Sequence, residues 1–265
     1  LSVLSKGPFE DRLRKAMTRL LHVDDMDRLS FYQNSVRSEF PPQVSGLAGR
    51  EKRLLRMLTA SLFAQVQEDI RSLQAAVDVL WQHSQVLNEL ETLFRISESQ
   101  VSHRGETYDP SGEIPLCVHA RYTRIEILAA FGEGDDFKTP IWREGVRWSA
   151  ANKTDILAFT LSKTPGKFSP STMYKDYAIS RELIHWESQS LTSEQSNTGQ
   201  RYQNHRTDGT TIALFARETS DERAFWFLGN GQYVSHEGSR PMAIIWKLDH
   251  PLPGDLYSSF VSAVA

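Results

Sequence analysis

Aromatic and polar side chains that could bind a planar ring alternate through residues 168–205 of this sequence. Tyrosines, a tryptophan and histidines are interleaved there with amides, hydroxyls and carboxylates, and a shorter stretch of the same kind spans residues 233–242. A planar heterocycle needs such a mixture, because its faces stack on aromatic rings while its edge requires donors and acceptors at fixed positions. These stretches predict a heterocycle-binding site, and an aromatic core with polar turns is the alternative interpretation.

Two acidic residues in the same region support a second hypothesis, that of a metal-dependent nuclease. Asp176 is followed by Glu187, Ser188 and Gln189, which is similar to the Asp…Glu-x-Lys layout of such nucleases with Gln in place of Lys. Two carboxylates near one site could hold Mg²⁺, which prefers oxygen ligands. The absent lysine and the loose spacing make this the weaker hypothesis.

Other catalytic and cofactor motifs are missing from the sequence. His185, His205 and His236 are dispersed and have no cysteine support, so we predict no metal site built on them. No Walker-type lysine loop is present, so any ATPase activity must lie outside this chain. We expect no cofactor and no catalytic residue in this chain.

The elements that must position these residues change character along the chain. Apolar residues recur at helical spacing through the first hundred residues, and residues 97–115 lose that periodicity, which indicates a linker. A short helix follows, with Thr123 and Glu126 as its capping box and Gly132 at its end. β-branched and aromatic runs then occupy residues 156–161, 211–216, 224–228 and 243–248, separated by turn residues.

This pattern predicts an α+β fold in two domains. Residues 1–100 form an N-terminal α-helical bundle or spacer, and residues 116–265 form a β-rich barrel or sandwich. Residues 184–190 alternate in polarity, and we expect them to form a strand that enters a functional cleft.

Composition limits the classes of protein to which the chain can belong. The formal net charge is −3, so no global basic field is available to hold nucleic acid, and any DNA-binding face must be local. The single cysteine, Cys117, fits a reducing cytoplasm, and no apolar run is long enough to predict a membrane span. The chain begins with Leu1 rather than Met, which suggests an excised fragment.

Several motifs together resemble a known family. They are Trp142-Arg143-Glu144-Gly145-Val146, residues 168–180, His185-Trp186-Glu187-Ser188-Gln189-Ser190, Thr198-Gly199-Gln200-Arg201-Tyr202 and residues 233–242. The chain is similar to the C-terminal region known as DUF3427 in bacterial proteins that fuse a phospholipase-D-type nuclease to a superfamily 2 helicase. The helical stretch resembles the segment between helicase and C-terminal domain in those proteins.

The resemblance implies a role in ATP-dependent type IV restriction, which attacks DNA carrying 5-methylcytosine or 5-hydroxymethylcytosine. It implies an SRA-like module that flips the modified base, with no cutting or translocation by this chain alone. ATP, and Mg²⁺ with it, would belong only to the missing domains. The expected partners are double-stranded DNA with modified cytosine, the helicase and nuclease domains of the parent chain, and a possible second copy.

A binding site for the flipped base can be predicted from side-chain chemistry. Tyr174, Tyr177 and Trp186 would stack on the base, and Asp176 would accept from the cytosine 4-amino group. Ser188 and Gln189 would bond the remaining edge of the base. The predicted pocket comprises Tyr174, Asp176, Tyr177, Trp186, Ser188 and Gln189. The predicted phosphate contacts are Lys175, Arg201, Arg206 and Arg240.

Two other functions remain as alternatives at this point. A nuclease using Asp176 and Glu187 would cleave DNA in Mg²⁺ without help from other domains. A protein–protein docking or dimerisation module would use the helices as its interface and the aromatic residues as core.

Overall fold

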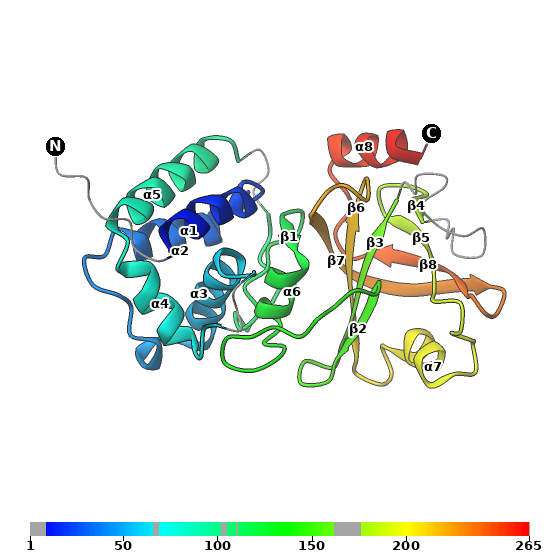
Figure 1. The fold of residues 1–265 in the computed structure, drawn as a ribbon. Coiled ribbons are helices and arrows are strands. Elements are labelled where there is room, and N and C mark those ends of the chain that lie inside the picture. The colour runs from blue at the N-terminus through cyan, green and yellow to red at the C-terminus, as the bar shows by residue number, and fades with distance from the viewer. Residues whose placement is uncertain (1–8, 66–68, 102–104, 110, 162–175, 265) are drawn as a thin grey trace. The chain divides into compact units, whose positions relative to one another are not determined.

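The structure, a computed structural model, describes residues 9–65, 69–101, 105–109, 111–161 and 176–264, and the chain forms two compact units (Figure 1). The first is Leu1–Ile141 and the second is Trp142–Ala265. The sequence suggested a division between residues 100 and 116, whereas the first unit continues beyond it through residues 116–141. Each unit is described separately below.

The first unit is mainly helical, and its third helix forms its centre. Its elements are α1 (Glu10–Met17), η1 (Thr18–Leu20), α2 (Met26–Val36), η2 (Val44–Gly46), α3 (Gly49–Leu62), α4 (Leu73–Trp81), α5 (Ser84–Ser99), β1 (Arg121–Thr123) and α6 (Arg124–Ala130). Residues 54–62 of α3 are all buried, and α3 packs against α1, α2, α4 and α6. The apolar residues that recur at helical spacing in this stretch are therefore part of the core of the unit.

Two helix starts show how local sequence sets these boundaries. At α2, the side chain of Asp25 caps the helix by accepting the backbone N–H of the residue three positions later at 2.8 Å, and the neighbouring Asp24 is not the cap. Asp24 instead accepts hydrogen bonds from the backbone N–H and the Nε of Arg121, each at 2.9 Å. At α6, Glu126 bonds back to the N–H of Thr123, which confirms the predicted capping box.

A buried ion-pair network joins α2 to α6 within the first unit. Arg28 is fully buried, pairs with Asp25 through Nε, and donates from Nη1 to Oε1 of Glu126 at 3.1 Å. Its guanidinium carbon lies 4.0 Å from the centre of the Tyr122 ring, and Nε2 of His22 lies 2.6 Å from Oε2 of Glu126. Burial alone would raise the pKa of Glu126, but His22 and then Arg28 outweigh it and lower that pKa to about 2. Residues 116–141 therefore share one core with the N-terminal helices.

The second unit is built on a mixed β-sheet. Its elements are β2 (Val146–Ser149), β3 (Thr154–Thr160), β4 (Tyr177–Ala178), β5 (Leu183–Glu187), α7 (Asn197–Asn204), β6 (Thr211–Arg217), β7 (Ala224–Glu237), β8 (Ala243–Leu248) and α8 (Gly254–Val264). The strands follow the order β2-β3-β6-β7-β8-β5-β4, in which β3 and β6 are parallel and the other neighbours are antiparallel. The long strand β7 pairs with β6 through its first half and with β8 through its second.

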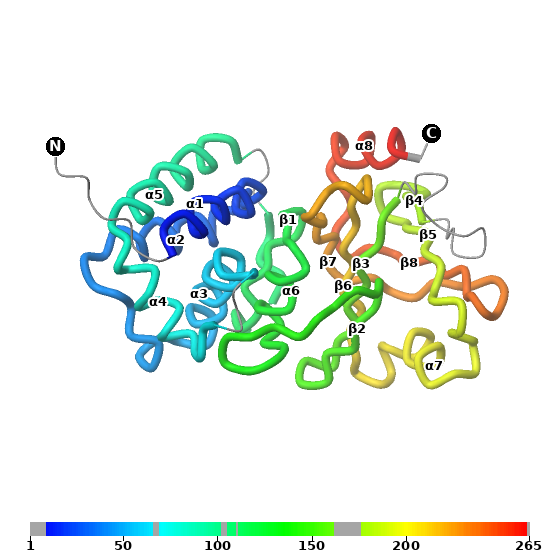
Figure 2. The backbone as a smooth tube through the Cα atoms, viewed as in Figure 1, coloured from blue at the N-terminus to red at the C-terminus, as the bar shows by residue number. Residues whose placement is uncertain are grey.

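This sheet is open rather than closed. The strand path ends at β2 and at β4, so among the described residues the predicted α+β class is confirmed but a closed barrel is not seen. One face of the sheet carries the main core of the unit, to which α7 adds Tyr202 and α8 adds Leu256 and Phe260. These two helices lie at opposite ends of the second unit (Figure 2).

The predicted strands agree well with those observed. The runs at 156–161, 211–216 and 224–228 fall almost wholly within β3, β6 and the first part of β7, and the run at 243–248 is β8. The alternating segment from residue 184 contains most of β5. Sequence patterns did not identify α7, α8 or β2. Within the described parts of the chain, no helix is both long enough and apolar enough to cross a membrane.

Candidate nucleic-acid interface

Alternate residues of four strands project from the sheet away from its core and form a partly exposed surface, here called the outer face. The strand register places Tyr177 beside His185, then Ile245 and Ser235, in one row across β4, β5, β8 and β7. Two flanking rows run parallel to it. They are Leu183, Lys247 and Gln232 on one side, and Glu187, Ala243 and Glu237 on the other. All ten residues are half-buried or exposed, whereas their strand neighbours Ile184, Trp186, Ile244 and Trp246 are buried.

A stacked aromatic pair is the most distinctive feature of the outer face. The rings of Tyr177 and His185 lie 4.6 Å apart between centroids and are inclined by only 13°. Tyr177 is 37% exposed, and it belongs to β4, the two-residue strand at the edge of the sheet. Stacking on His185 fixes the orientation of the Tyr177 ring, and part of that ring stays exposed to solvent. A further planar ring could therefore stack there without reorganising the sheet.

The charges on the outer face are of both signs. Lys247 is exposed in the middle of β8, and Glu187 is half-buried at the end of β5. Glu187 and His185 share this face because they are two residues apart on one strand. The outer face thus combines a ring for stacking, a carboxylate acceptor and a cation, with Ile245 as an apolar neighbour of His185.

Three of the predicted pocket residues are part of the protein interior instead. Trp186 is 3% exposed and lies in the core, where its ring centroid is 5.8 Å from that of Tyr202 and 6.4 Å from that of Trp246. Ser188 is fully buried, and its hydroxyl oxygen accepts the backbone N–H of Met242 at 2.9 Å. Its own N–H donates to the carbonyl of that residue at 2.9 Å. Ser188 therefore holds the end of β5 to the start of β8.

Asp176 is also structural in this conformation. It is 3% exposed, and its Oδ1 accepts the backbone N–H of Glu187 at 2.9 Å. Asp176 precedes the core residue Ala178 by two positions and therefore lies on the core side, while the Glu187 side chain belongs to the outer face. The two carboxylates of the nuclease hypothesis thus lie on different faces of the sheet. Among the residues that the structure describes, no group of three His, Cys, Asp or Glu side chains is arranged to hold a metal ion.

The remaining predicted residues are distributed over several elements. Tyr177 lies on the outer face, and half-buried Gln189 donates from Nε2 to Oε2 of Glu144 at 3.0 Å. Arg206 and Arg240 are exposed, the first just after α7 and the second in the turn between β7 and β8 with φ of 71°. Tyr174 and Lys175 lie outside the described residues. The structure does not bring the described pocket residues together in one hollow.

Arg201, the last predicted phosphate contact, forms an ion pair on the core side of the sheet. Its Nε and Nη2 donate to the two carboxylate oxygens of Asp155 at 2.5 and 2.7 Å. Asp155 is fully buried, and the hydrogen bonds to it raise the pKa of Arg201 above its ordinary value. The guanidinium carbon lies 4.2 Å from the ring centre of Trp148. The guanidinium is therefore charged and held in one orientation.

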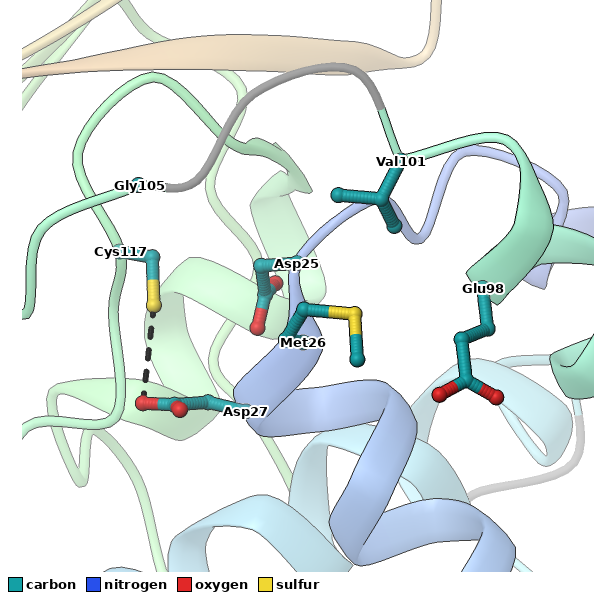
Figure 3. Close-up of a pocket in the computed structure, with 7 residues that line it drawn as sticks. All are labelled: Asp25, Met26, Asp27, Glu98, Val101, Gly105 and Cys117. Carbon is teal, nitrogen blue, oxygen red and sulfur yellow. Dashed lines mark hydrogen bonds between the residues drawn. The ribbon is translucent and has the colours of Figure 1, made fainter.

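A cavity of about 550 Å³ in the first unit was not anticipated from the sequence. It is lined by Asp25, Met26, Asp27, Glu98, Val101, Gly105 and Cys117 (Figure 3). The thiol of Cys117 lies 3.7 Å from Oδ2 of Asp27. Burial, and then the carboxylates of Asp25 and Asp27, raise the pKa of that thiol well above its ordinary value. These residues are far apart in the sequence, so no local motif marks the cavity.

A family model described as a domain of unknown function, DUF3427, matches residues 116–260. This range begins in the first unit, includes α6, and continues through the whole sheet of the second unit into α8. No curated protein matches the chain.

Proposed function

We propose that this chain, which belongs to the DUF3427 family, is the DNA-reading part of a larger ATP-dependent restriction enzyme and binds duplex DNA that carries 5-methylcytosine or 5-hydroxymethylcytosine. The family is the one whose motifs the sequence resembles. The observation that carries the proposal is the stacked Tyr177–His185 pair, which presents an accessible aromatic ring on the outer face of the sheet.

The outer face offers the chemistry that a cytosine requires. A base extruded from the duplex would stack on Tyr177, a contact of about 1–3 kcal/mol per base. Glu187 would accept from the 4-amino group of cytosine, the role first predicted for the buried Asp176. Ile245 supplies an apolar surface for a 5-methyl group, whose burial contributes about 0.8 kcal/mol.

The charge of the second unit fits a reader that depends on the base more than on the backbone. Residues 142–265 contain equal numbers of basic and acidic side chains, so the unit is formally neutral. Non-specific binding to DNA rests on Lys and Arg neutralising phosphates, and it should be weak here. Base recognition would then provide most of the difference in affinity between modified and unmodified duplexes.

Binding measurements on the whole chain test this proposal. The affinity for one short duplex, unmodified, 5-methylated or 5-hydroxymethylated at a single cytosine, is measured by fluorescence anisotropy at fixed salt, with and without Mg²⁺. We expect tighter binding to a modified duplex. Tyr177→Ala should weaken that binding about 5- to 150-fold, the equivalent of one stacked base.

Two further variants make the test specific. Glu187→Gln should reduce the preference for cytosine over thymine at the target position, because an amide can also donate to the O4 of thymine. Phe40→Ala removes a ring that is 72% exposed in the first unit and should leave binding unchanged. Equal affinity for all three duplexes would refute the reading of modified cytosine, and Mg²⁺-dependent cleavage by the chain would favour a nuclease.

A further inference from the structure

Arg201 on α7 is held in place before any ligand binds. Both carboxylate oxygens of Asp155 accept from it, and the Trp148 ring lies against its guanidinium. Asp155 comes from β3 and Trp148 from the neighbouring strand β2, where the register pairs the two residues. The Arg201 side chain nevertheless remains 23% exposed. Such an arrangement orders a long side chain that on most surfaces is flexible.

The guanidinium keeps unused hydrogen-bonding capacity. An arginine has five N–H donors, and Asp155 accepts only two of them, one from Nε and one from Nη2. The other three donate to no residue in the described parts of the chain. A planar guanidinium with free, parallel donors matches the paired oxygens of a phosphate group. Two other cations are close in sequence to this ion pair and exposed: Lys153, two residues before Asp155, and Arg206, five residues after Arg201.

We propose that Arg201 is a preoriented binding site for phosphodiester oxygens of the DNA backbone. The proposal rests on the proposed function and adds a second contact to it. In the strand order, β2 and β3 are at the opposite end from β5 and β4, so this contact is separate from the base-reading outer face. Because phosphates carry no sequence information, Arg201 contributes affinity for every duplex and leaves the preference for the modified base to the outer face.

A purely structural role is the competing interpretation, in which the ion pair only anchors α7 to the sheet. The double variant Arg201→Gln with Asp155→Asn separates the two roles. It replaces the ion pair with a neutral amide pair that can still hydrogen-bond, so no buried charge is left unpaired. The matched control is Arg37→Gln with Glu91→Gln, which neutralises an exposed ion pair in the first unit and likewise keeps the net charge.

The readouts are the dissociation constants for modified and unmodified duplexes over a range of salt concentrations, with circular dichroism to establish folding. We expect the double variant at Arg201 to bind both duplexes about tenfold more weakly, with an unchanged ratio between them. For this variant, the slope of log K against the logarithm of the salt concentration should be shallower by about 0.9, the value for one phosphate contact. The control should behave as the wild type. A folded double variant with wild-type affinity and salt dependence would overturn the proposal.

A second measurement separates this proposal from the proposed function. The Nε–Hε NMR signal of Arg201 is followed while dimethyl phosphate is added, and the double variant serves to assign the signal. If the wild-type chain binds no duplex, the proposed function fails. A saturable shift of the Arg201 signal would then still support a phosphate site, and the absence of a shift would overturn it.

Discussion

Glu126→Gln should destabilise the first unit strongly at neutral pH and remove part of its sensitivity to acid. The carboxylate is fully buried, and its pKa is lowered from 4.5 to about 2, since the effects of His22 and Arg28 exceed that of burial. A tenfold change in proton affinity is about 1.4 kcal/mol, so this difference corresponds to about 3 kcal/mol of folding free energy. Because the pKa is depressed in the folded state, the stabilisation is complete above pH 4.5 and is lost as the pH falls from there towards 2.

Urea-induced unfolding, followed by the helical circular-dichroism signal at pH 6 and at pH 3, measures this effect. At pH 6 the variant should unfold with about 3 kcal/mol less free energy than the wild type, because Arg28 loses a buried counter-charge. At pH 3 the gap should become smaller. Hydrogen exchange of the α6 amides, residues 124–130, locates the change. Glu91→Gln, which removes an exposed partner of Arg37, is the control and should cost less than about 1 kcal/mol. A Glu126→Gln protein within about 0.5 kcal/mol of the wild type at both pH values would refute the assigned role of the network.

Two further predictions concern packing and reactivity. Gly199→Ala should destabilise the second unit by about 1–3 kcal/mol, because the added Cβ would lie 2.0 Å from the carbonyl oxygen of Ser193. Gly254→Ala is the control and should be tolerated, because a Cβ added there would have no atom within 4 Å. Thermal unfolding of the two variants checks this, and equal melting temperatures would contradict it. Cys117 should react slowly with a thiol reagent at pH 8, since burial and the neighbouring carboxylates raise its pKa and keep it protonated. Rapid labelling of the folded chain would show that the thiol is accessible, and labelling in urea gives the reference rate.

Local patterns in the sequence were sufficient for most secondary structure. The capping box of Thr123 and Glu126 depends on residues three positions apart, and the structure confirms it. The run at 243–248 coincides with β8 because its β-branched and aromatic residues favour a strand that has one buried face. Helix α7 was missed because its short sequence is mostly polar. Its N-cap, Ser196, accepts the N–H of Gly199, and Tyr202 packs into the core.

The sequence by itself determined the α+β class, the family resemblance and the presence of an aromatic–polar segment, because each of these is a property of residue types and their spacing. Only the tertiary structure decided which of those residues remain accessible. Alternation along β5 indicates that His185 and Trp186 occupy opposite faces, but helix α7 covers one face and thereby makes Trp186 core and leaves His185 on the outer face. The pairing of Arg201 with Asp155, and of Arg28 with Glu126, joins residues distant in sequence. Burial and charge pairing over such distances arise only when the chain is folded, and they decide which polar side chains can bind a ligand.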